Sequence, residues 1–154
     1  MRLVKTKNKL LLILFIAITG SEILFANYAF YRQVTSTCKS YRVEVSSGEM
    51  LLSADNNNFA INLSSRRNNF ELIMLVGFAA AGKAIIHQKH LQGTISNYNP
   101  VIPGQVNVVV TVPMGRNNTI FSAEANAILV QELADGSLDS ADFMRKIKDS
   151  IQTL

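Results

Sequence analysis

Three basic side chains recur at helical spacing in the middle of the chain: Lys83, His87 and His90. Intervals of four and three residues place them on one face of a helix. Two histidines could supply two ligands to a metal ion. A zinc site needs three or four ligands, and neither a third histidine nor a neighbouring carboxylate completes this motif. We therefore expect no metal site and no cofactor.

Two interpretations of this cluster stay open. Cationic groups collect at a helix C-terminus because they complement its dipole. Alternatively, Lys83, His87 and His90 contact an anion or another ligand. Tyr98 is a further candidate contact, because it lies in a long connection that contains prolines, and binding residues are often found on such loops.

Other sequence motifs are incomplete. The pair Gly82-Lys83 lacks the upstream glycine of a phosphate-binding loop and lies within a helical stretch. Residues 135–143 resemble the second half of an EF-hand loop, but the third position of that loop would be Leu133, which cannot bind calcium. We expect neither a nucleotide site nor a calcium site, and the sequence offers no catalytic residues.

The single cysteine, Cys38, excludes an internal disulfide. No histidine lies near it in the sequence to act as a base. In an exported chain an unpaired cysteine is either a spare thiol or half of an intermolecular disulfide, and both alternatives stay open.

The positive charge is concentrated at the start of the chain. The formal net charge is +4, but residues 27–154 carry 11 basic and 10 acidic side chains, a net charge of +1. A nearly neutral domain lacks the electrostatic footprint that a polyanion requires. We therefore exclude nucleic acid as a partner.

The first residues have the organisation of an export signal. Basic residues in the segment 1–9 precede an apolar run, 10–18, and a polar stretch, 19–22. These are the parts of a secretory signal peptide, and cleavage could follow Ala26 or Ala29. The remainder of the chain would then be periplasmic or secreted.

An uncleaved membrane anchor is the alternative. Residues 10–31 are close to the ~20 residues that span a bilayer, and Arg32 follows them. Tyr28, Phe30 and Tyr31 would then lie at the aromatic interface, with the basic N-terminus cytoplasmic. Glu22 would lie in the span at a cost of about 2.5–3.5 kcal/mol near its middle.

Period-two alternation of apolar residues predicts four strands, each buried on one face. The segments are 41–46, 50–54, 59–64 and 105–112. The first three form an antiparallel meander, since turn-favouring Ser, Gly, Asp and Asn residues separate them.

Helical periodicity predicts three helices, at 69–91, 122–134 and 139–153. Ser122 and Asp139 are the expected N-caps of the last two, Gly136 ends the middle one, and Asp142–Lys146 is an expected ion pair. The longest helix is apolar, but only 11 residues separate Glu71 from Lys83, which favours a core helix over a membrane span.

These elements predict an α+β fold in the order β-β-β-α-β-α-α. We expect a two-layer sandwich in which helices cover a mostly antiparallel four-stranded sheet, preceded by a hydrophobic signal or anchor helix. The expected organisation is residues 1–26 as signal or anchor, 27–40 as linker and 41–154 as the exported domain.

Three classes of function remain. The favoured one is an exported, non-catalytic domain that acts by binding or assembly in the cell envelope, periplasm or extracellular space. The second is an accessory subunit of a membrane complex, anchored through residues 10–31, in which Glu22 needs a partner. The third is a small enzyme that uses His87, His90 and Lys83. A protein partner, a small ligand and a homo-oligomer are all compatible with the first two.

Overall fold

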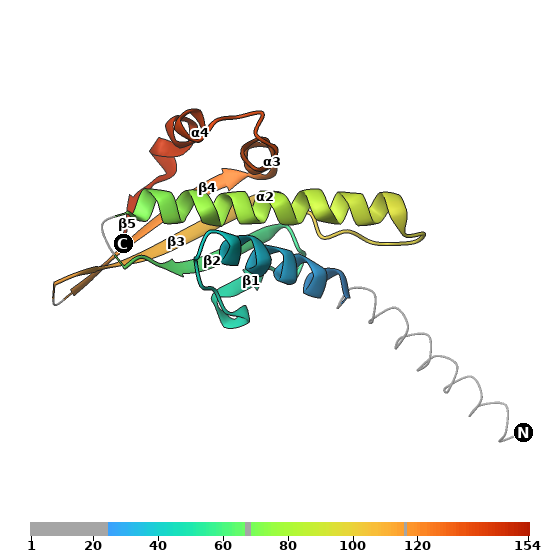
Figure 1. Cartoon of the computed structure of the whole chain (residues 1–154), viewed down its shortest axis with the longest axis horizontal. Coiled ribbons are helices and arrows are strands. Elements are labelled where there is room, and N and C mark those ends of the chain that lie inside the picture. Colours follow the sequence, from blue (N-terminus) through green and yellow to red (C-terminus); the bar gives the residue numbers. More distant parts are fainter. Residues whose placement is uncertain (1–24, 67–68, 116) are drawn as a thin grey trace, which may run out of the picture.

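The computed structural model describes residues 25–66, 69–115 and 117–154. It confirms the α+β class: helices pack against one mixed, five-stranded sheet (Figure 1). The described chain is helical through residues 25–40. The elements that follow are η1 (Ser47–Glu49), β1 (Met50–Leu52), β2 (Asn58–Ser64), α2 (Phe70–Thr94), β3 (Gln105–Met114), β4 (Asn117–Asn126), α3 (Ala127–Asp135), α4 (Ser140–Ile147), η2 (Lys148–Ser150) and β5 (Gln152–Thr153).

The sheet has the order β1-β2-β3-β4-β5, so it has five strands and not the four that we expected, and it is mixed, with one parallel pair. Strands β2 and β3 are parallel because α2 crosses between them and returns the chain to the same end of the sheet. The other three pairs are antiparallel. The β3–β4 hairpin extends past the end of β2, whose pairing with β3 stops at Thr111.

The helix predicted from Ser122 is wrong at its start, because β4 continues to Asn126. Every residue of β4 pairs with β3, and Ala123 and Ala125 are buried with period two. Ladder pairing thus overrides the helical preference of alanine. The helix begins after Asn126, whose side chain accepts a hydrogen bond from the Leu129 amide.

Two other predicted elements differ. Residues 41–46 are not a strand: Arg42 has a left-handed φ of 60°, and Val43 is buried without a strand partner. The C-terminal helix is shorter than predicted, since α4 ends at Ile147 and the chain continues through η2 into β5.

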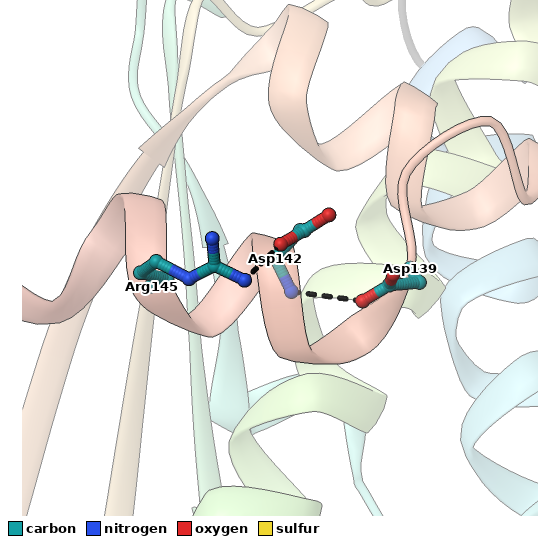
Figure 2. Close-up of polar contacts among 3 residues, drawn as sticks. All are labelled: Asp139, Asp142 and Arg145. Atoms are coloured by element: carbon teal, nitrogen blue, oxygen red, sulfur yellow. Dashed lines mark hydrogen bonds and ion pairs between the residues drawn. The ribbon is translucent and has the colours of Figure 1, made fainter.

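The predicted helix boundaries near residue 136 are confirmed. Gly136 adopts a left-handed φ of 85° after α3, as a helix C-terminus requires. Figure 2 shows the start of α4, where the Asp139 carboxylate accepts a hydrogen bond from the Asp142 amide at 2.8 Å. The ion pair of Asp142 is with Arg145, one residue before the expected Lys146.

One face of the sheet forms the core. Phe59, Ile61 and Leu63 of β2 are buried, whereas the intervening Asn62 is exposed. Helix α2 lies over this buried face: a Cβ at Gly77 would be 3.0 Å from Leu63. Within the described ranges, α2 is the one helix long and apolar enough to cross a membrane, and half of its apolar stretch is buried in the domain.

Residues 27–40, which we expected to be a linker, are helical and contribute to the core. Phe30, Val34 and Cys38 recur every four residues and are fully buried. The ring centroid of Phe30 lies 5.0 Å from that of Phe59. The Tyr31 hydroxyl accepts a hydrogen bond from the Leu52 amide of β1 at 2.9 Å. This segment therefore packs on the same face of the sheet as α2.

The closest helix contact gives a stability prediction. A Cβ at Gly82 of α2 would lie 2.0 Å from the backbone oxygen of Val130 in α3, so Gly82→Ala forces the two helices apart. Overpacking outweighs the gain of up to about 1 kcal/mol in helix propensity, and we expect a net loss of about 2–3 kcal/mol in denaturant unfolding.

Gly93 of the same helix is the matched control, because no atom from another part of the chain lies within 4 Å of the site of its Cβ. Gly93→Ala should stabilise the protein by about 0.5–1 kcal/mol. Equal effects of the two substitutions would show that α2 and α3 do not pack at Gly82.

Candidate functional site

A fully buried amide, Gln88, connects three separate parts of the chain. Its Nε2 donates a hydrogen bond to the carbonyl of Ala26 at 3.0 Å. Its Oε1 accepts two, from the Tyr98 hydroxyl and from the Val101 amide, each at 2.9 Å. The amide thereby fixes helix 25–40 and the loop after α2 to α2 itself. An unpaired amide at this depth would cost about 1–3 kcal/mol.

Tyr98 has a structural role in this arrangement. Its hydroxyl is a donor to Gln88, and partial burial raises the pKa of that hydroxyl above its ordinary value. Its ring contacts Phe25 edge-on, with centroids 6.4 Å apart. Residue 25, the C-terminus of α2 and the following loop therefore lie at one end of the domain (Figure 1).

The structure does not bring the four predicted contact residues to one site. Lys83 is exposed and near Asp135, the residue that ends α3. His90 is exposed, and Tyr98 is engaged by Gln88. His87 is the one of the four that lines the groove between α2 and helix 25–40, where its neighbours are Leu91 of α2 and residues of helix 25–40.

This groove, which we call the Arg32 groove, lies between helix 25–40 and α2 and has a volume of about 430 Å³. Its cationic side chain is Arg32, His87 adds an imidazole, and no carboxylate of the described residues lines it. The lining residues are Phe25, Tyr28, Ala29, Arg32, Gln33, Ser36, His87 and Leu91. Sequence reasoning missed the groove because it treated residues 27–40 as a linker. The spacing of Ala26, Phe30 and Val34 is the helical signal that could have revealed this wall.

No metal site is evident in the part of the chain that the structure describes. There, no three side chains of histidine, cysteine, aspartate or glutamate come close enough together to bind an ion.

The Cys38 thiol is buried against the core and is not exposed at the entrance to the domain. Burial raises its pKa to about 11, so the thiol is protonated at neutral pH. A buried, protonated thiol is a poor nucleophile and cannot reach a second chain without local opening. This packing argues against an intermolecular disulfide and leaves Cys38 as a free thiol in the core.

The Gln88 contacts predict a graded loss of stability. Gln88→Met keeps the length of the side chain but leaves Tyr98 and Val101 without their acceptor, and we expect a loss of about 2–3 kcal/mol in denaturant unfolding. Tyr98→Phe removes one of these hydrogen bonds and should cost about 1 kcal/mol.

Gln92→Met is the control, since Gln92 is exposed on the same helix and its substitution should change the free energy of unfolding by less than about 0.5 kcal/mol. If Gln88→Met were as stable as Gln92→Met, the amide would not hold these elements together.

The burial of Cys38 predicts slow labelling by a maleimide at neutral pH in the native protein and complete labelling in denaturant. Ser36 is exposed on the same helical segment, so a Cys38→Ala/Ser36→Cys variant should label rapidly without denaturant. Equal native rates in the two proteins would contradict the burial of the thiol.

Comparison with protein-family models, curated proteins and solved structures gives no match to this chain.

Proposed function

We propose that this chain is a small exported domain that acts by binding or assembly at a membrane, to which its N-terminal apolar segment keeps it attached. The observation that carries the proposal is the hydrogen bond from Gln88 to the carbonyl of Ala26. This hydrogen bond supports the proposal because it makes Ala26, at the end of the predicted membrane segment, part of the core of the domain.

Retention of the N-terminal segment fits the packing better than its removal. Ala26 is 1% exposed, and it is the residue after which one predicted cleavage would occur. Cleavage after Ala26 or Ala29 would remove the acceptor of the Gln88 Nε2 group and leave a buried donor unpaired. The uncleaved chain avoids this loss.

The lipid-facing part of an anchor would have to end before Phe25, because Phe25 contacts Tyr98 and Ala26 is buried against Gln88. Phe30 and Tyr31 pack on the sheet and cannot form the aromatic interface that we expected of them. Tyr28 is 62% exposed and Phe25 is 56% exposed, so these two rings are available instead. Residues 10–24 then remain for the hydrocarbon region, fewer than the ~20 residues of a typical span, so the exposed rings of Phe25 and Tyr28 would lie at the membrane interface.

Binding is favoured over catalysis by the arrangement of the basic side chains. An enzyme built on His87, His90 and Lys83 requires these groups to converge on one substrate. Only His87 of the three lines the Arg32 groove, and Lys83, one turn earlier on α2, is near Asp135 of α3 instead. An open groove with cationic and amide groups is suited to holding a partner or ligand.

The proposal predicts a full-length species in the membrane fraction of the native host. Intact mass spectrometry of the soluble and membrane fractions should find residue 1 to residue 154 in the membranes, with no mass that corresponds to cleavage after Ala26 or Ala29. A soluble species that begins at residue 27 or 30 would overturn it.

Glu22, which lies outside the described residues, tests the role as a subunit of a membrane complex. Glu22→Leu should leave the protein in the membrane but weaken its co-purification with partner chains, because a carboxyl group in a bilayer needs a partner. Unchanged co-purification would favour an anchored domain that acts alone.

A further inference from the structure

We propose that the Arg32 groove binds the headgroup of an anionic phospholipid of the membrane to which the chain is attached. This inference rests on the proposed function. It goes further by naming the ligand class, the residues that hold it and the direction in which the lipid enters.

The groove is amphipathic along its length. Helix 25–40 and α2 run in opposite directions, since Ala26 contacts Gln88 and Phe25 contacts Tyr98 beyond the end of α2 (Figure 1). The end of the groove nearest residue 25 is therefore apolar, with Phe25, Tyr28 and Leu91. One turn further from that end, the lining becomes polar and cationic, with Arg32, Gln33, Ser36 and His87.

This order matches a lipid that enters from the membrane side. The chain before residue 25 leaves the domain at the apolar end, where Ile95 and Ile102 are also partly exposed. Arg32 is seven residues beyond Phe25, which is about 10 Å along a helix axis. The polar zone of a bilayer is about 5–8 Å thick on each side. The long arginine side chain can extend back toward the membrane and reach the level of the phosphates.

The charge of the groove favours an anionic lipid. No described carboxylate lines it, and the one ion pair in the described part of the chain joins Arg145 to Asp142. The Arg32 guanidinium thus keeps its donors for a phosphate, which arginine binds with two parallel hydrogen bonds. A free phosphate ion would use this polar half alone, whereas a phospholipid also covers Phe25, Tyr28 and Leu91.

The test uses the full chain in detergent micelles, titrated with phosphatidylglycerol, with phosphatidylcholine or with inorganic phosphate. Native mass spectrometry counts the bound molecules. We expect phosphatidylglycerol to be retained about fivefold better than phosphatidylcholine, as one basic side chain near an anionic lipid surface provides. Arg32→Gln should abolish this preference. Lys146→Gln, a matched loss of one positive charge at an exposed site on α4, should leave it intact.

Three other outcomes would overturn the inference, and each would point to a different alternative. Equal retention of the two lipids, or an unchanged preference in Arg32→Gln, would exclude a headgroup site at Arg32. Displacement of phosphatidylglycerol by equimolar inorganic phosphate would assign the groove to a soluble anion. A dimer that Arg32→Gln dissociates, with no bound lipid, would assign it to a second copy of the chain.

Failure of the proposed function is measured separately. Intact mass and alkaline extraction of native membranes show whether the full-length chain is membrane-bound. If it is bound and shows no lipid preference, the headgroup inference fails and the anchoring proposal stands. If the chain is cleaved and soluble, both fail.

Discussion

The arrangement of the domain depends on the hydrogen bonds of one buried side-chain amide, that of Gln88. Gln88 has no exposed surface, and its hydrogen bonds reach a residue 62 positions earlier and another 13 positions later in the chain. A buried amide is tolerated only when its polar atoms are paired. Helix 25–40, α2 and the loop before β3 must therefore be in place together. The separation of the two helices that form the Arg32 groove follows from this contact.

Helix packing on a single face of the sheet follows from small residues in α2. Gly77 lies against Leu63 and Val108, and Gly82 allows the backbone of α3 to approach at Val130. Side chains at these positions would hold the layers apart. The opposite face carries exposed polar residues such as Asn62. The close approach of α2 to the sheet and to α3 is thus a consequence of the two glycines in α2.

Sequence patterns predicted the elements whose buried residues follow a simple pattern along the chain. Helix α2 and strand β2 were found because a long apolar run and strict alternation are each compatible with few secondary structures. The second half of β4 was missed because Ala125 continues the helical spacing of the apolar residues of α3, and only the pairing with β3 decides the outcome. The candidate site was found only at His87. Its opposite wall depends on contacts of helix 25–40 with distant strands, such as Phe30 with Phe59, which no local pattern encodes.

The β3–β4 hairpin has a bearing on how copies of this protein behave when crowded. The Ser65 amide donates a hydrogen bond to the Thr111 carbonyl, so the backbone polar groups of Thr111 face the side of β3 on which β2 lies. Pro113 is two residues further along β3, and its backbone groups therefore face the same side. At Pro113, β2 has already ended, and proline has no amide hydrogen to offer. An incoming strand from another molecule would meet an edge that lacks a donor at this position. The protruding hairpin is thereby a poor template for edge-to-edge aggregation.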